Sequence, residues 1–120
     1  MTLLADRVVL VSGGTQGVGA GVARAAVREG AQVVITGRRA ERGEKAAADI
    51  GAVFVQADVA DVASAQASVA ATVERFGRID CLVNSAGLVD RGTLLDTTPE
   101  LFDRHIAINL RGPFFLMQAA

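Results

Sequence analysis

The feature that most constrains the fold is a regular alternation of short apolar runs with longer helical segments. The runs cover residues 8–11, 33–35, 53–55 and 79–83, and the first three contain apolar residues only. Runs without polar alternation indicate strands that are buried on both faces, as in a parallel sheet. Strands that alternate with helices are joined by right-handed crossovers. The sequence therefore predicts an α/β fold with a doubly wound parallel sheet.

Helical periodicity and capping residues place the helices. The expected helices cover residues 18–29, 40–50, 61–76 and 98–108, with a further helix from residue 114. Asp61 can cap the first turn of the third helix, and Gly77 can end its last turn. In the first helix the apolar residues Val18, Val22, Ala25 and Ala26 fall at helical spacing, and Gly30 follows as a stop signal. Gly112 and Pro113 are expected to form a joint between the last two helices.

Length and composition exclude several classes of protein. The chain has 120 residues, 51% of them hydrophobic, and a formal net charge of −1, so we expect one domain without the basic surface of a nucleic-acid-binding protein. One cysteine and one histidine exclude an internal disulfide and a multi-histidine zinc site, and Cys81 is expected to lie in the core. No apolar run approaches the ~20 residues that span a membrane, and the N-terminus does not resemble a signal peptide. We therefore expect a cytoplasmic protein without a metal site.

A glycine-rich loop over residues 12–19 lies between the first strand and the first helix. Its glycines have the spacing Gly-x3-Gly-x-Gly. Such a loop lets main-chain N–H groups and a helix N-terminus approach a phosphate, which a side chain at the tight turn would block. A plain glycine-rich turn is the alternative, but the strand–loop–helix context favours a phosphate site. The candidate cofactor-binding residues here are Ser12, Gly13, Thr15, Gln16, Gly17, Val18 and Gly19.

Two arginines follow the second strand. The strand ends in Thr36-Gly37, and Arg38 and Arg39 come next. In sheets of this kind an acidic residue here binds a ribose 2′-hydroxyl, whereas arginine accommodates a 2′-phosphate. Arginine pairs with phosphate through charge-assisted hydrogen bonds. The pattern favours NADP over NAD, and the alternative is that both arginines are solvated residues ahead of the next helix.

Polar or small residues also follow the third and fourth strands. Asp58 and Val59 follow the third strand, where a carboxylate can accept a hydrogen bond from an adenine amino group. Asn84, Ala86 and Gly87 follow the fourth, and small residues there let a ligand approach a strand end. Alone, the first pair reads as a helix start and the second group as a turn. Together with the two loops above, they lie at the C-terminal edge of one parallel sheet, where open α/β sheets bind ligands.

These motifs make the chain resemble the N-terminal half of a short-chain dehydrogenase/reductase. The family's Thr-Gly-x3-Gly-x-Gly appears at residues 12–19 with Ser12 in place of threonine, and its Asn-Asn-Ala-Gly appears at residues 84–87 with Ser85 at the second position. Asp58 matches the family's adenine-binding aspartate, and Asn109 matches the asparagine of its catalytic tetrad. The resemblance runs from about residue 6 to residue 120.

The resemblance implies a Rossmann-like NAD(P)-binding domain over residues 1–120. It implies hydride transfer between a nicotinamide cofactor and a small alcohol or carbonyl substrate, with NADP as the expected cofactor and NAD as the alternative. It also implies a homodimer or homotetramer for the complete protein. Of the catalytic tetrad only Asn109 has a counterpart, because the family's Tyr-x3-Lys and serine do not appear and the chain contains no tyrosine.

The resemblance further implies an incomplete fold. We expect the chain to be truncated inside its last helix, with the fourth strand left as an exposed edge. Two alternatives to a working oxidoreductase therefore stay open. The chain could be a non-catalytic module that binds a dinucleotide or dimerises, or it could be an inactive truncated fragment.

Overall fold

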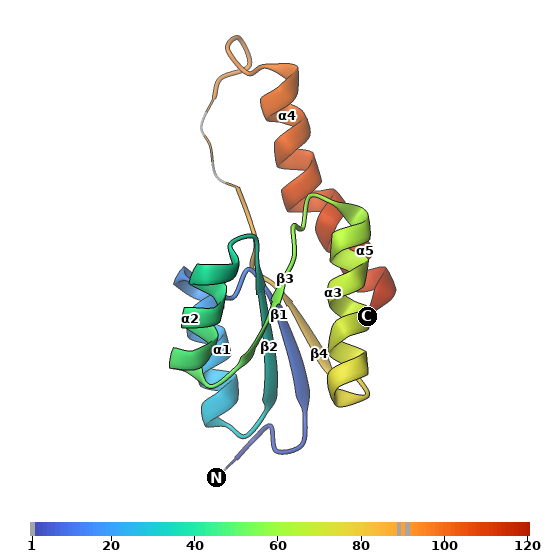
Figure 1. Cartoon of the computed structure of the whole chain (residues 1–120). Coiled ribbons are helices and arrows are strands. Elements are labelled where there is room, and N and C mark those ends of the chain that lie inside the picture. The colour runs from blue at the N-terminus through green and yellow to red at the C-terminus, as the bar shows by residue number, and fades with distance from the viewer. Residues whose placement is uncertain (1, 89, 91) are drawn as a thin grey trace.

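A parallel sheet forms the centre of the computed structural model, which describes residues 2–88, 90 and 92–120 (Figure 1). The strand order is β3-β2-β1-β4, and all three neighbouring pairs are parallel. The strands are β1 (Val8–Ser12), β2 (Gln32–Gly37), β3 (Val53–Gln56) and β4 (Cys81–Asn84). Among the described residues, β4 lies at one edge of the sheet, as expected.

Helices cover both faces of this sheet, which confirms the predicted doubly wound, Rossmann-like fold (Figure 1). On one face, α1 (Gly17–Arg28) and α2 (Ala40–Ile50) pack against Val9, Val11, Val33 and Ile35. On the other face, α3 (Val62–Phe76) and α5 (Gly112–Ala119) pack against Leu10 and Val34. Successive strand residues point to opposite faces. The apolar runs are unbroken because each face has its own core.

Helix α1 faces the sheet through its smallest residues. The buried residues of this helix are Gly19, Ala23 and Ala26, whereas Val18 is 79% exposed. The helix begins at Gly17 and packs through its smallest residues, so its axis lies close to the sheet. Val18 is therefore not part of the buried face, and it lines the cleft described below.

The fourth strand is shorter and less buried than predicted. It begins at Cys81 rather than at residue 79, because Asp80 uses its main-chain N–H and its carboxylate to hold the start of β1. Cys81 itself is exposed, so the prediction that it lies in the core is wrong. Both ends of β4, Cys81 and Asn84, are exposed, and its two central residues are half-buried.

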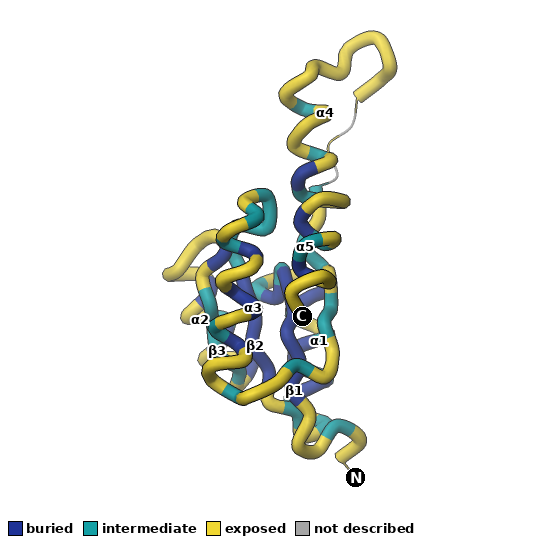
Figure 2. Tube along the Cα trace, turned by 90° about the vertical axis from the view of Figure 1, so that its right-hand side faces the viewer, coloured by how far each residue is buried: buried dark blue, intermediate teal, exposed yellow. Residues whose placement is uncertain are grey.

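The expected joint at Gly112 and Pro113 is absent, and one continuous helical rod occupies the region instead. Helix α4 (Pro99–Ile106) passes through a π-helical turn, η1 (Ala107–Arg111), directly into α5. A π turn carries one extra residue per turn and so relaxes the hydrogen-bond ladder where proline cannot donate. Gly112 has ordinary helical dihedrals, and a Cβ there would contact the main-chain oxygen of Val59. This glycine therefore serves close packing rather than a break. Figure 2 shows α4 extending beyond the sheet, with no buried residue.

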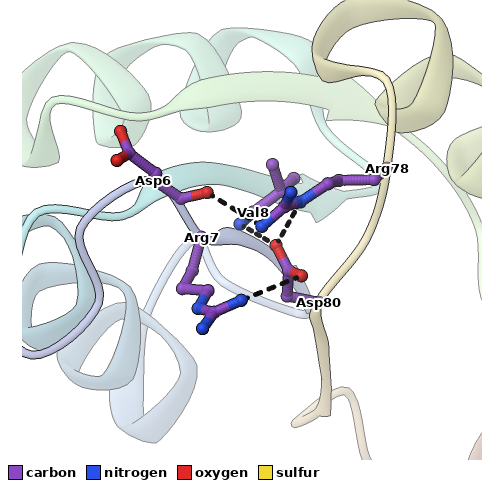
Figure 3. A network of polar contacts seen from close by, with 5 residues as sticks. All are labelled: Asp6, Arg7, Val8, Arg78 and Asp80. Atoms are coloured by element: carbon purple, nitrogen blue, oxygen red, sulfur yellow. Dashed lines mark hydrogen bonds and ion pairs between the residues drawn. The ribbon is translucent and has the colours of Figure 1, made fainter.

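An ionic network ties the chain together at the end of the sheet opposite to the strands' C-terminal edge (Figure 3). Asp80 Oδ2 accepts a hydrogen bond from the Val8 N–H at 2.8 Å and one from Arg78 Nε at 2.9 Å. Arg7 Nη1 lies 3.8 Å from Asp80 Oδ1, and Arg78 also donates to the Asp6 carbonyl. The hydrogen bond from the Val8 N–H is the main cause that holds the pKa of the Asp80 carboxyl below its ordinary value of 3.8, and the hydrogen bond from Arg78 is the next largest. The ionised carboxylate therefore stabilises the folded state.

Replacing Asp80 by asparagine is expected to lower the unfolding temperature modestly near pH 7. The carboxyl pKa is lower in the folded than in the unfolded chain, so its contribution is present above pH 3.8 and is lost as the pH falls below that value. The difference between the wild type and Asp80→Asn should therefore shrink as thermal melts are taken from pH 7 toward pH 3. A difference that stays constant over this range would contradict a role for the charge.

Candidate functional site

A cleft of about 520 Å³ opens at the C-terminal ends of the parallel strands. Loops that follow β1, β2, β3 and β4 all contribute to it, as the sequence predicted. The predicted site residues that line it are Ser12, Gly13, Thr15, Gln16, Gly17, Val18, Arg38, Arg39, Asp58, Val59, Ala86 and Gly87. Three predicted residues lie outside the lining, namely Gly19, Asn84 and Asn109.

The glycine-rich loop is pressed between two strand ends. Gly13 has a φ of +79°, which favours glycine, and a Cβ there would lie 2.6 Å from the main-chain nitrogen of Ala86. The Gly13 N–H donates to Thr36 Oγ1 at 3.4 Å, and the Gly14 N–H donates to the Thr36 carbonyl at 3.1 Å. The loop therefore takes its position from β2 on one side and from the β4 loop on the other.

The first turn of α1 offers free N–H groups at the cleft. The first main-chain bond of the helix runs from the Ala20 N–H to the Gln16 carbonyl, so the N–H groups of Gly17, Val18 and Gly19 have no partner within the helix. Gln16 occupies the N-cap position, but its side chain does not cap the helix. A Cβ on Gly17 would meet no described atom within 4 Å, which leaves open space beside these donors. Donors of this kind at a helix N-terminus fit a phosphate.

Gly19 supports this turn from beneath. It is buried, and a Cβ at this position would collide with the Gly13 carbonyl oxygen and lie 3.0 Å from Ser85 Oγ. The residue is absent from the cleft lining because the loop covers it. Because Gly19 has no side chain, the first turn of α1 can lie directly against the loop.

Arginines gather where β2 ends. The predicted Arg38 and Arg39 both line the cleft, and Arg42 from the first turn of α2 joins them. Arg42 Nη1 donates to Gln16 Oε1 at 3.0 Å and so connects α2 with the glycine-rich loop. Sequence reasoning missed Arg42, which lies in the first turn of the helix whose N-cap position is Arg39. Arg104 from α4 is a further cation in the lining that was missed.

Asp58 is the one carboxylate among the residues that line this cleft. Its Oδ1 accepts the Ala60 N–H at 3.0 Å, and its own N–H donates to Ser64 Oγ at 2.9 Å. These bonds fix the loop between β3 and α3 and leave the half-buried carboxyl group at the cleft. Val59 lines the cleft beside it, and a Cβ on Gly112 would contact the Val59 main chain.

The loop after β4 is held by main-chain bonds. The N–H groups of Ser85 and Ala86 both donate to the Ser12 carbonyl, at 3.0 and 2.8 Å. Ala86, Gly87 and Leu88 then line the cleft. Asn84 is exposed, and within the described part of the chain its side chain makes no hydrogen bond. The strand pairing of Asn84 with Ser12 holds this position.

Asn109 joins the helical rod to that same loop. Its Oδ1 accepts the Leu88 N–H and its Nδ2 donates to the Leu88 carbonyl, both at 2.8 Å. The side chain thus satisfies both main-chain groups of one residue that lines the cleft. Asn109 lies within the π turn η1, and π turns are frequent at functional sites. Ile108, one residue earlier, lines the cleft directly and was also missed by sequence reasoning.

The described residues hold neither a metal cluster nor a membrane-spanning helix. Residues 2–88, 90 and 92–120 contain no group of three or more His, Cys, Asp or Glu side chains arranged to hold a metal ion. None of the helices described there is long and apolar enough to cross a membrane.

Comparison with known proteins places the chain in a family. A model of the short chain dehydrogenase family matches residues 7–120. An L-rhamnose 1-dehydrogenase (NAD(P)(+)) of Azotobacter vinelandii is 39% identical over 98% of this chain and 50% of its own length. An NADP-dependent (R)-specific alcohol dehydrogenase of Lentilactobacillus kefiri is 43% identical over 93% of this chain and 46% of its own.

Solved structures agree with the relatives found by sequence. A short-chain dehydrogenase/reductase of Serratia marcescens superposes with a TM-score of 0.93 at 34% identity, covering 98% of this chain and 50% of that one. A blue fluorescent protein from a metagenomic library, in complex with NADPH, gives a TM-score of 0.92 at 32% identity, covering 98% and 51%. The chain spans about half the length of the curated relatives it matches. With a family model matched over residues 7–120, the chain belongs to the short chain dehydrogenase family.

Proposed function

We propose that the chain binds NADP at the cleft, with NAD as the alternative, and forms the cofactor-binding half of an oxidoreductase. The observation that carries this is the composition of the cleft. The cleft contains the free N–H groups at the start of α1 and four guanidinium groups, but only one carboxylate among its lining residues. The guanidinium groups belong to Arg38, Arg39, Arg42 and Arg104. Such an excess of donors and positive charge suits the phosphates of a dinucleotide.

Each part of the cleft has a role in this proposal. The first turn of α1 would hold the pyrophosphate, and the small loop at Ala86 and Gly87 would let the cofactor approach the end of β4. Asp58 would accept a hydrogen bond from the adenine amino group, and Arg38 with Arg39 would bind the 2′-phosphate. The relative from Lentilactobacillus kefiri is named as NADP-dependent, and the Azotobacter relative is named for both cofactors.

The proposed reaction is hydride transfer with a small alcohol or carbonyl compound as the substrate. The nicotinamide supplies or accepts the hydride when the cofactor is bound. Asn109 would fix the Leu88 loop beside the cleft and, as in the family's tetrad, support the proton relay. The tyrosine that the family uses as acid/base has no counterpart among these 120 residues. Catalysis is therefore proposed for the whole protein, and cofactor binding for this chain.

A second candidate function is a non-catalytic module that binds a dinucleotide. The same cleft supports it, because binding a dinucleotide there requires no catalytic residue. Both candidates require cofactor binding, and only the first requires substrate turnover. Oxidation of NADPH in the presence of a panel of small ketones distinguishes them.

Calorimetric titration of the chain with NADPH and NADH tests the proposal. We expect saturable binding of one molecule per chain, tighter for NADPH because of the arginines at the end of β2. Binding of neither dinucleotide would refute the cofactor site. Tighter binding of NADH would keep the site and overturn the choice of NADP.

We also propose that the protein assembles as a homodimer or homotetramer and works in the cytoplasm. The assembly is supported by apolar side chains that lie exposed at spacings of three or four along the α4–α5 rod, namely Phe102, Ile106, Leu110, Phe114 and Met117. Such a stripe on one helix face is typical of a surface that packs against another apolar surface. A second copy of the chain would supply that surface.

A further inference from the structure

Arg42 occupies a place in the cleft that the sequence did not indicate. It projects from the first turn of α2, and its Nη1 donates to Gln16 Oε1 at 3.0 Å across the opening. Both residues line the cleft, together with Arg38 and Arg39. The contact therefore joins the two walls that flank the end of β2.

The Gln16 side chain does not cap the helix that it precedes. Short side chains such as Ser, Thr, Asp and Asn are the ones that accept a hydrogen bond from the first-turn N–H groups at an N-cap. Gln16 is the N-cap of α1, with an extended backbone, and its side chain makes no capping bond. Its amide oxygen accepts from Arg42 instead, so the helix start stays open and the guanidinium is held in place.

Arg42 keeps most of its donors and all of its charge for another partner. A guanidinium has five N–H donors, and the bond to Gln16 uses only one of them. In the described part of the chain Arg42 forms no ion pair, whereas Arg24 on the outer side of α1 is paired with Asp49 at 2.7 Å. A held and unpaired guanidinium is well suited to a phosphate, because less side-chain freedom is lost on binding.

We propose that Arg42 determines specificity for the 2′-phosphate of the cofactor and that Gln16 is its positioning residue. This inference rests on the proposed function, since it assumes that a dinucleotide occupies the cleft. It adds a third guanidinium, contributed by α2, to the two that directly follow β2. It also explains how the glycine-rich loop, which carries no basic residue, can still contribute to phosphate selection.

The test compares adenosine 2′,5′-bisphosphate with 5′-AMP, two probes that differ only in the 2′-phosphate. Arg42→Gln is expected to weaken binding of the bisphosphate about tenfold, as for loss of one charge-assisted hydrogen bond at an exposed site, and to leave 5′-AMP binding unchanged. Arg28→Gln is the matched control, because Arg28 lies at the far end of α1 and is exposed. It removes the same charge and should change neither affinity.

The outcomes separate this inference from the function on which it rests. If the wild type binds neither probe, the cofactor site itself is refuted. If the wild type prefers the bisphosphate and Arg42→Gln keeps that preference, the role of Arg42 is overturned. An equal loss for both probes would also overturn it, since the residue would then not read the 2′-phosphate.

A double substitution tests the positioning role of Gln16. Gln16→Ala alone should lower the preference for the bisphosphate by several-fold, because Arg42 loses the acceptor that holds it. In the Arg42→Gln background the same change should have no further effect on that preference. Additive losses would show that Gln16 acts independently of Arg42, and would overturn its assignment as the positioning residue.

Discussion

Replacing Gly19 by alanine is expected to disable the cleft, although alanine favours helices and Gly19 lies inside one. The added Cβ would collide with the Gly13 carbonyl oxygen, which belongs to the main chain of the glycine-rich loop. The Gly13 position is itself fixed by Thr36 and by the Ala86 loop, so the carbonyl cannot retreat without moving both strand ends. We therefore expect the helix start and the loop to separate.

The effect should appear in both stability and binding. Overpacking of this kind costs about 1–3 kcal/mol, and the first-turn N–H groups would no longer meet a phosphate held by the loop. We expect a lower unfolding temperature and a loss of NADPH affinity on the order of 10- to 100-fold. Thermal melts and calorimetric titration of the same samples measure the two effects.

Gly21 provides a matched control in the same helix. It is exposed, and a Cβ there would meet no described atom within 4 Å. Gly21→Ala should raise stability by about 0.5–1 kcal/mol, because alanine has the higher helix propensity, and should leave NADPH binding unchanged. The same substitution two residues apart is thus predicted to have opposite signs. If Gly19→Ala and Gly21→Ala both raised the stability of the chain, Gly19 would have no close contact with the loop.

The fold could be predicted from the sequence because its main determinant is local. The runs at β1 and β2 are apolar without interruption, and only a sheet covered on both faces accommodates such strands. The parallel arrangement then brings every strand's C-terminal end to one edge, so residues as distant as Gly13 and Ala86 could be placed together. The resemblance to a known family pointed to the same edge.

What the sequence did not predict depends on packing between elements. Helix α1 packs through small residues that leave Val18 exposed, which apolar periodicity does not detect. The π turn around Asn109 lies next to the close approach of Gly112 to the Val59 loop, a tertiary contact that local sequence does not reveal. Arg42 was missed because its partner, Gln16, lies 26 residues away. In each case the deciding atom belongs to another segment of the chain.

Reversing the charge at Arg38 is expected to invert the choice of cofactor. Arg38 lines the cleft immediately after β2, where a carboxylate binds a ribose 2′-hydroxyl and a guanidinium binds a 2′-phosphate. Arg38→Asp removes a charge-assisted hydrogen bond worth about 1–3 kcal/mol and places a negative charge beside the phosphate. NADPH affinity should therefore fall about 10- to 100-fold, whereas NADH affinity should hold or rise because the new carboxylate can accept from the hydroxyl.

The ratio of the two affinities is the quantity that decides this prediction. Salt should weaken the NADPH binding of the wild type more than its NADH binding, since screening acts on the additional phosphate charge, and this difference should be smaller in Arg38→Asp, where one guanidinium fewer faces that phosphate. Arg28→Asp reverses an equal charge at the far end of α1 and should leave the ratio unchanged. An equal loss of both cofactors in Arg38→Asp would mean that Arg38 supports the cleft as a whole. The 2′-phosphate would then have to be bound by Arg39 and Arg42, the other arginines on this side of the cleft.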